Sequence, residues 1–439
     1  MKSVVAVTLF SFFVVVCNAD ESPEQDSEEQ PHSGTVEDIQ SERLDTNEGL
    51  DFQDRTVDTG FDRTFVNAAD EVTDLLEAPD RTQEQRDAPF VLRGAWNTLY
   101  QTISDGFPDT DRWGVASDFD VVGTWKLAKK GEADQGQLFF HIEGRWDYGT
   151  TAPSTLGVTS LGSLIRTADS FNSYTPTFLP FRNFYWQQGS AEAGWIYRLG
   201  KITIDQILGT SRHMSPFTTF LPTGSIGVNH PMPDSGWGAV GAWYFNDRSY
   251  VLGALTDANA DRYGLKKPEG DIFTAVEYGY KIDPGSERAG FSKFTVSHTD
   301  GTSDGRPKNA QLGPSGWGFT VKLEKELAAD GRSIGILKLG RSTNDSGPYR
   351  KLASVHYLLY DTNLPLGRSS DNDLIGVGLT WTEPAIPGTQ NETLFDILYR
   401  FPLLSWAEAT LNYQSVFNPA LNADVDHAHV FNFRLRVTF

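Results

Sequence analysis

Hydrophobic and polar residues alternate with a period of two over most of the chain after Asp111. A β-strand produces this pattern because its successive side chains point to opposite faces. Segment 137–148 shows it most clearly, with one mainly ionic face and one apolar and aromatic face. The first face carries Gln137, Phe139, His141, Glu143, Arg145 and Asp147, and the second carries Leu138, Phe140, Ile142, Gly144, Trp146 and Tyr148.

The same split recurs in segments 407–417 and 431–439. About fourteen strand-like segments lie between Trp113 and Phe439, and two weaker ones, Phe184–Gln188 and Ile202–Ile207, would raise the number to sixteen. Bacterial outer-membrane barrels have even strand numbers. We therefore predict an all-β fold, a transmembrane antiparallel β-barrel of sixteen strands over residues 111–439. A barrel of this size encloses an aqueous channel.

Aromatic residues favour a membrane barrel over a soluble β-sandwich, which also alternates. Membrane barrels bound their apolar band with aromatic girdles. The tryptophans that fall at or near predicted strand ends are Trp113, Trp125, Trp146, Trp195, Trp237, Trp243, Trp317, Trp381 and Trp406. A Ser-Gly-Trp-Gly quartet at Ser235–Gly238 recurs at Ser315–Gly318, and each copy is expected to open a strand. An aromatic-rich, lectin-like soluble sheet is the alternative.

Two segments before Asp111 have a helical period instead. Trp96, Leu99, Tyr100 and Ile103 fall on one helical face, which predicts a short helical segment within residues 88–110, over Val91–Ile103. This helix would lie inside or beneath the barrel, or act as a linker. A second amphipathic helix is expected over Thr64–Ala78, with a transient helix in a solvated tail as the alternative.

The charge is concentrated in one segment. Residues 20–87 hold 22 Asp and Glu against 5 Arg, so they carry −17 of the net charge of −21. Such a polar composition cannot bury a core, and we expect an acidic, largely disordered periplasmic tail. The remaining chain is nearly balanced. The overall charge therefore gives no evidence for cation selectivity, and nothing indicates nucleic-acid binding, which needs a basic footprint.

Residues 1–19 have the three parts of a secretory signal peptide: Lys2, an apolar run, and a small residue at Ala19. Cys17 would be an acylation site in a lipoprotein, but Val16 precedes it where a small residue is required. Its removal with the signal leaves no cysteine, which excludes disulfides and thiol chemistry. We expect secretion to the outer membrane of a diderm bacterium, in contact with its lipid.

The last strand ends at Phe439, and its outer face is wholly apolar. This ending resembles the terminal signal by which bacterial outer-membrane proteins are recognised, so the barrel assembly machinery is an expected partner through Phe439. An even strand number would place both ends of the barrel in the periplasm.

Several local stretches resemble the carbohydrate-selective porins, the OprB family. They are Phe184–Gln188 leading to Leu199–Lys201, Ser211–Leu221, Leu255–Asn259, Asn418–Asn422, Arg434–Arg436 and the terminal Phe439. The resemblance covers about residues 111–439. It implies a sixteen-stranded barrel, passive diffusion of sugars, and a constriction built by an inward loop and charged wall residues. Two features depart from the family: three residues separate Lys201 from Asp205, where the family has an acidic residue sooner, and the acidic tail is additional.

Sugar selectivity requires charged and polar groups in the pore lining, together with flat aromatic faces. Strand alternation gives Glu143, Arg145, Asp147, Arg434 and Arg436 as lining candidates, and the resemblance adds Lys201, Asp205 and Arg212 at the start of an inward loop. The alternative for each is an ordinary solvated lumen charge.

No catalytic motif is found, and no cofactor or metal is expected. Asp257, Asn259 and Asp261 imitate the start of a calcium loop, but Arg262 and Pro268 occupy the positions of its glycine and its bidentate glutamate. Three functions remain open. The chain is a diffusion porin for small hydrophilic solutes, a lipase or protease on a barrel, or a barrel that anchors an envelope-binding tail. The enzyme hypothesis rests on a histidine close to a nucleophile, with candidates His141, His213, His298 and His356.

Overall fold

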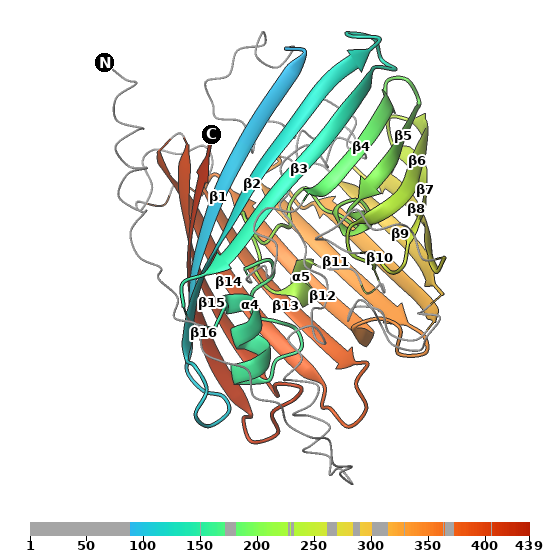
Figure 1. Ribbon diagram of the computed structural model, residues 1–439. Helices are drawn as coiled ribbons and strands as arrows, with labels where there is room; N and C mark the ends of the chain where they lie inside the picture. Colours follow the sequence, from blue (N-terminus) through green and yellow to red (C-terminus); the bar gives the residue numbers. More distant parts are fainter. Residues whose placement is uncertain are drawn as a thin grey trace, which may run out of the picture. The chain divides into compact units, whose positions relative to one another are not determined.

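The computed structural model describes residues 88–149, 151–171, 181–226, 229, 232–260, 270–283, 290–300, 315–328, 330–362, 364, 373–404 and 406–439. The predicted signal peptide, the acidic tail and the predicted helix over Thr64–Ala78 lie outside these residues. Within them, sixteen antiparallel strands form one closed barrel, because each strand pairs with its neighbour along the chain and β1 pairs with β16 (Figure 1). The predicted fold class and strand number are confirmed.

The strands are β1 (Phe90–Ile103), β2 (Trp113–Ala128), β3 (Gly136–Asp147), β4 (Phe181–Ser190), β5 (Trp195–Ile202), β6 (Gly236–Asn246), β7 (Ser249–Asp257), β8 (Ile272–Lys281), β9 (Phe291–Thr299), β10 (Gly316–Glu326), β11 (Ser333–Ser342), β12 (Tyr349–Tyr360), β13 (Leu374–Pro384), β14 (Glu392–Leu404), β15 (Ala407–Phe417) and β16 (His427–Thr438). The short helices are α4 (Pro153–Leu156), a π-helical turn (Gly157–Leu161), a 3-10 turn (Ile204–Gln206) and α5 (Thr223–Ile226). No helix of the described residues is long and apolar enough to cross a membrane.

The helix predicted over Val91–Ile103, within residues 88–110, is wrong: the segment forms β1 and closes the barrel. Its apolar residues lie on both faces of a strand. Tyr100 is exposed on the outside, whereas Leu99 is buried inside, in one hydrophobic cluster with Phe217. An apolar residue on each face imitates the spacing of a helix, and the barrel therefore begins at Phe90 rather than at residue 111.

The two weaker strand predictions have different outcomes. Phe184–Gln188 lies within β4, as expected. The second, Ile202–Ile207, is wrong, because β5 lies earlier, over Trp195–Ile202, and Ile204–Gln206 forms a 3-10 turn. Both Ser-Gly-Trp-Gly quartets open strands as predicted, since β6 begins at Gly236 and β10 at Gly316.

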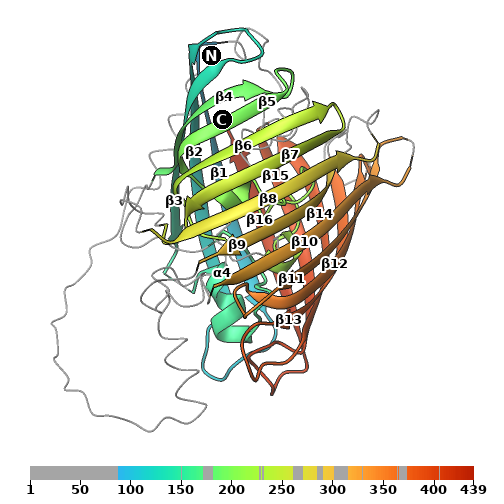
Figure 2. The ribbon, with the colours of Figure 1, turned by 90° about the vertical axis from the view of Figure 1, so that its right-hand side faces the viewer.

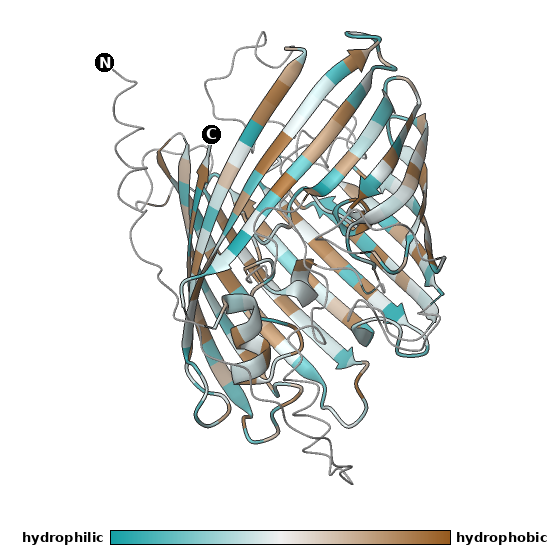
Figure 3. Cartoon of the chain, in the orientation of Figure 1, coloured by the Kyte–Doolittle hydropathy of each residue, from teal (hydrophilic) through white to brown (hydrophobic). Residues whose placement is uncertain are grey.

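The outer face of the barrel is apolar and rich in aromatic side chains. Apolar and polar bands alternate along the strands in Figure 3. The exposed tryptophans lie at or near strand ends, as a girdle requires, and include Trp113, Trp125, Trp237, Trp243, Trp317 and Trp406. Exposed Leu, Val, Ile and Phe side chains fill the band between them. This outer face is suited to lipid.

The two rims of the barrel have connections of different length. At the proximal rim, where β1 begins and β16 ends, neighbouring strands are joined by short turns such as 191–194, 247–248 and 405–406. At the distal rim the connections include 148–180 and 203–235. Outer-membrane barrels have the same asymmetry, with short periplasmic turns and long external loops.

The two longest distal connections fold into the barrel. Residues 152–171 and 203–226 are mostly buried, and α5 contacts β12 and β13. Apolar residues of the second connection, Ile204, Leu208 and Met232, pack with Val240 and Leu252 of β6 and β7. We call the described parts the first inward segment (151–171) and the second inward segment (203–226).

Candidate functional site: the inner wall of the barrel

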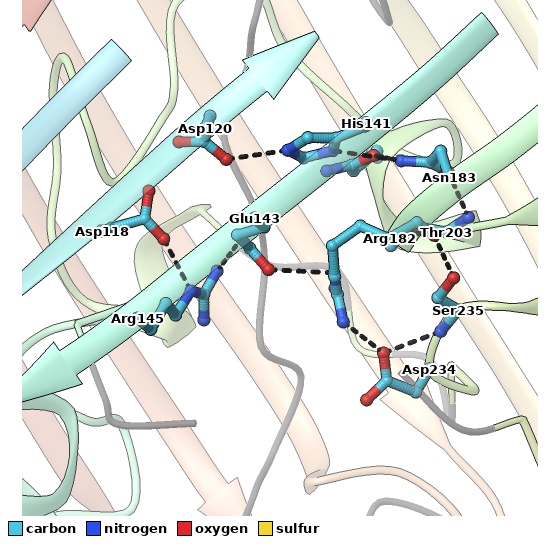
Figure 4. Close-up of polar contacts among 11 residues, drawn as sticks. Asp118, Asp120, His141, Glu143, Arg145, Arg182, Asn183, Thr203, Asp234 and Ser235 are labelled. Atoms are coloured by element: carbon cyan, nitrogen blue, oxygen red, sulfur yellow. Dashed lines mark hydrogen bonds and ion pairs between the residues drawn. The ribbon is translucent and has the colours of Figure 1, made fainter. Parts of the chain in front are cut away.

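A network of charged side chains covers the inner wall of β2, β3 and β4 (Figure 4). Asp118 of β2 lies opposite Arg145 of β3 in the strand register, and alternation turns both inward. Arg145 Nε lies 2.6 Å from Asp118 Oδ2, and its Nη2 lies 2.6 Å from Glu143 Oε1. All three side chains are fully buried. Charges removed from water in this way need close partners of opposite sign.

Arg182 of β4 connects this network to the chain that follows the second inward segment. Its Nε lies 3.1 Å from Glu143 Oε2, and its Nη1 lies 2.6 Å from Asp234 Oδ1. The hydroxyl groups of Thr203 and Ser235 both donate to the carbonyl oxygen of Arg182. Both ends of connection 203–235 are therefore fastened to the same residue (Figure 4).

His141 extends the network along β3. Its Nε2 lies 2.7 Å from Asp120 Oδ1. The side-chain amide of Asn183 hydrogen-bonds both His141 Nδ1 and the second inward segment. Potential ligand atoms of Asp120, His141 and Glu143 lie within 4.8 Å of one another, a separation that a metal ion could bridge. However, the guanidinium groups of Arg145 and Arg182 already neutralise Glu143. We therefore interpret the group as an ion-pair network.

A second charged group on β8, β9 and β10 holds the middle of the second inward segment. Glu324 Oε2 accepts a hydrogen bond of 2.6 Å from the Ser211 hydroxyl and lies 3.3 Å from Lys322 Nζ. Lys322 donates to the carbonyl oxygen of Thr210. Glu277 accepts a hydrogen bond of 2.6 Å from the backbone N–H of Gly209. Wall charges thus satisfy the backbone of a segment that has little regular structure of its own.

The inner wall formed by β14, β15 and β16 is rich in arginine. Arg434 of β16 donates to the carbonyl oxygens of Pro216 and Thr219, the latter at 3.2 Å, so it holds the second inward segment as well. Arg436 lies in register with Glu408 of β15, and Arg400 Nε lies 3.7 Å from the same glutamate.

Amides and hydroxyls hold the first inward segment. Thr167 donates to Gln101 Oε1 at 2.9 Å, and Gln414 donates to the Thr167 carbonyl oxygen at 2.8 Å. Glu392 of β14 accepts hydrogen bonds from the Ser163 hydroxyl and the Leu164 N–H. The two inward segments are therefore attached by different chemistry, one mainly neutral and one mainly ionic.

The predicted lining residues occupy several kinds of place. Glu143, Arg145, Arg434 and Arg436 face inward, as alternation predicts, and they are at most 2% exposed. This burial supports neither solvation by the lumen nor direct contact with a solute, so their role in lining a passage stays a prediction. Asp147 is half-buried at the distal end of β3, Asp205 is buried in the 3-10 turn, and Arg212 is half-buried in the second inward segment.

Lys201 is the exception among these candidates. It lies in register with Phe184 and Trp237, whose side chains are exposed on the outer face, yet it is only 2% exposed itself. The structure joins Glu143 to Arg145 directly and places Arg434 and Arg436 on one face of β16.

Sequence reasoning missed Asp118, Asp120, Arg182, Lys322 and Glu324. Asp118 and Asp120 alternate within the period-two region that follows Asp111, so this pattern gives their inward direction. Alternation does not give the direction of Arg182, because the pairing of β3 with β4 shifts register beside this residue.

Three histidines that the enzyme hypothesis requires have acidic or phenolic partners. His141 pairs with Asp120, His213 Nδ1 lies 2.7 Å from the Tyr360 hydroxyl, and His298 Nδ1 lies 3.6 Å from Asp300. In the calcium-like stretch, Asp257 Oδ1 accepts a hydrogen bond from the Asn259 N–H, which closes a turn.

No known family pattern and no curated protein sequence matches the chain. Solved structures do match. The high-pH structure of Pseudomonas putida OprB superimposes with a TM-score of 0.61 and 11% identity, over 81% of this chain and 96% of that one. The chain has an OprB-like porin fold. The low-pH structure of the same protein gives a TM-score of 0.47 at 11% identity, over 81% and 94% of the two chains. A mutant of Rh. blastica porin gives 0.49 at 8% identity, over 80% and 100%. The resemblance predicted from the sequence is confirmed for the fold.

Proposed function

We propose that this protein is an outer-membrane porin that allows passive diffusion of small hydrophilic solutes, preferentially neutral carbohydrates. The observation that carries the proposal is the closed sixteen-stranded barrel, which has an apolar outer face and a largely polar inner wall. Only closed barrels and helices can cross a bilayer, because no water satisfies backbone groups there. The fold, shared with Pseudomonas putida OprB, supports the same proposal.

The inward segments support a narrow and selective passage. A sixteen-stranded barrel encloses an aqueous channel unless chain segments fill it. Here parts of two distal connections are fastened inside and occupy part of the interior, so a passage through the barrel would be narrower than the barrel itself. Selectivity in such a pore follows its width and the donors and acceptors that line it.

The mixed charge of the inner wall favours neutral solutes. Carboxylates of β2 and β3 are paired with arginines of the same region, and Glu408 lies beside Arg400 and Arg436. Paired charges leave no strong field of one sign to attract ions, so a neutral solute is not disfavoured relative to a charged one.

Barrel assembly machinery is proposed as a partner through the C-terminal end of β16. Phe439 continues the seam between β16 and β1, because its N–H donates to the Gly94 carbonyl at 3.0 Å and its carbonyl accepts from the Gly94 N–H at 2.9 Å. Phe439 is 56% exposed, and its ring stacks on Phe119 at the outer face, where an assembly factor could bind it.

Single-channel recording in planar bilayers tests the proposal. The purified chain should give discrete conductance steps, and added disaccharide should reduce the current, because a sugar in the constriction displaces conducting water and ions. Heat-denatured protein at equal concentration is the control. A correctly folded barrel that gives no conductance would overturn the proposal.

A further inference from the structure

Two histidines stand next to each other on the outer face of β16, at the distal rim. His427 begins β16 and His429 follows two positions later, so strand alternation turns both side chains outward, while Ala428 between them is buried. Their ring centroids lie 4.3 Å apart. β15 lies beside β16 in the barrel wall (Figure 2), and its outward residues contact both rings.

The outward residues of β15 hold the two imidazole rings in place. Phe417 lies in register with His427, and their rings stack with centroids 4.5 Å apart and planes inclined by 12°. The Tyr413 hydroxyl lies 2.6 Å from His429 Nδ1 and 2.9 Å from the Ser415 hydroxyl. Each ring therefore has a defined position before any ligand binds.

Ring nitrogens of both histidines remain available to a ligand. In the part of the chain that the structure describes, the contact with Tyr413 is the one hydrogen bond made by either imidazole ring. A neutral imidazole has one N–H donor and one nitrogen lone pair. When His429 Nδ1 donates to the Tyr413 hydroxyl and this hydroxyl donates to Ser415, the lone pair of His429 is on Nε2. His427 is exposed, so a ligand can reach its ring.

The separation of the two rings suits a metal ion. A metal–nitrogen distance of about 2.0 Å places an ion about 3.2 Å from the centroid of each coordinating imidazole. Two imidazoles at a right angle around the ion then have centroids about 4.5 Å apart, close to the observed 4.3 Å, whereas tetrahedral coordination would need about 5.1 Å. The pair therefore suits the right-angled, tetragonal geometry that Cu²⁺ prefers. The exposed His427 ring can turn about its Cβ–Cγ bond with little movement of its centroid, which brings a nitrogen toward the ion.

The chemistry around the pair also favours a transition-metal ion. Imidazole nitrogens are common ligands of Zn²⁺, Cu²⁺ and Ni²⁺, and Cu²⁺ has the highest affinity for them. A histidine that binds a metal usually donates its other ring N–H to a nearby acceptor, and the Tyr413 hydroxyl is placed to accept from His429 Nδ1. The turn before β16 adds the exposed carboxylates of Asp424 and Asp426, whose negative charge attracts cations.

We propose that His427 and His429 together bind one divalent transition-metal ion, preferentially Cu²⁺, through one ring nitrogen each. Tyr413 is a positioning residue that holds His429 and fixes its tautomer. Water would complete the coordination, so the ion stays open to exchange at the distal rim. The inference needs only the folded barrel and is independent of the proposed solute transport.

Titration of the untagged full chain in detergent with Cu²⁺, followed by electron paramagnetic resonance, tests the inference. The wild type should bind one Cu²⁺ whose spectrum shows two imidazole nitrogens. His427→Gln and His429→Gln should each weaken this binding at least tenfold and remove one nitrogen from the spectrum. His298→Gln is the matched control, since His298 also faces outward near the distal rim but contacts Asp300 and Trp317. It should bind Cu²⁺ like the wild type.

Tyr413→Phe tests the positioning role, because it removes the hydroxyl and keeps the ring. It should weaken binding about tenfold while both nitrogens stay in the spectrum. Heat-dependent migration in gel electrophoresis confirms that each variant is folded before it is compared.

Equal Cu²⁺ affinity in the wild type and in both His427→Gln and His429→Gln would overturn the inference. So would a wild-type spectrum that lacks two imidazole nitrogens, because the ion would then be bound elsewhere in the chain. Unchanged affinity in Tyr413→Phe would overturn the role assigned to its hydroxyl.

Discussion

Arg182 and Asp234 form a buried ion pair, 2.6 Å apart, that joins the inner wall at β4 to the end of the connection that enters the barrel. Glu143 occupies the other side of the same guanidinium, at 3.1 Å. Glu143, which alternation assigns to the lining, therefore also helps to hold the connection that enters the barrel.

Removing this guanidinium should destabilise the barrel. In Arg182→Met, Glu143 and Asp234 both lose this buried cation, and breaking a comparable buried pair costs about 3–5 kcal/mol. Urea unfolding in lipid vesicles measures the change. Arg350→Met is the matched control, because Arg350 pairs with Asp345 at 2.6 Å near the distal rim, where both side chains are well exposed. Its free energy of unfolding should hardly change. Equal losses in the two variants would show that burial of the pair is irrelevant.

Loosening α5 should widen the passage. Lys338 Nζ donates to the carbonyl oxygens of Gly224 and Ser225 at 2.9 and 2.6 Å, so Lys338→Met leaves two buried acceptors without this donor. We expect a larger or noisier single-channel conductance than in the wild type. Lys351→Met removes an exposed pair with Glu383 at the distal end of the next strand and should leave the conductance unchanged. A Lys338→Met channel identical to the wild type would exclude α5 from the constriction.

A charge placed on the outer band should oppose insertion. Val355 of β12 is 52% exposed on the outer face, and arginine near the middle of the bilayer costs roughly 2–4 kcal/mol in a membrane barrel. Val355→Arg should therefore unfold at lower urea concentration in vesicles, whereas Glu132→Arg in the proximal turn after β2 should not. If Val355→Arg is as stable as the wild type, this face of the barrel does not meet lipid.

The terminal aromatic residue should matter for assembly more than for the finished fold. Replacing Phe439 by alanine keeps the backbone bonds to Gly94 and removes only the ring. We expect a several-fold lower amount of folded protein in the outer membrane of cells, with little change for Phe433→Ala, an exposed outward ring on the same strand. Normal amounts of the Phe439 variant would argue against recognition through this ring.

Alternation predicts the wall well, because each strand has one face toward lipid and one toward the interior. It fails at β1, where Leu99 and Tyr100 are apolar on opposite faces. It also cannot show that Arg434 and Lys322 bind backbone carbonyls of an inward segment, since those contacts join residues far apart in the chain. Period two gives the direction of a side chain, and only the folded structure gives its partner.

Liposome swelling with sugars of increasing size tests whether the barrel is a diffusion pore. Vesicles containing the purified protein should swell quickly in arabinose and glucose, more slowly in sucrose, and hardly at all in larger oligosaccharides. Charged solutes of similar size should enter more slowly than the neutral sugars. Swelling no faster than that of protein-free vesicles for every sugar would show that the barrel does not let sugars pass.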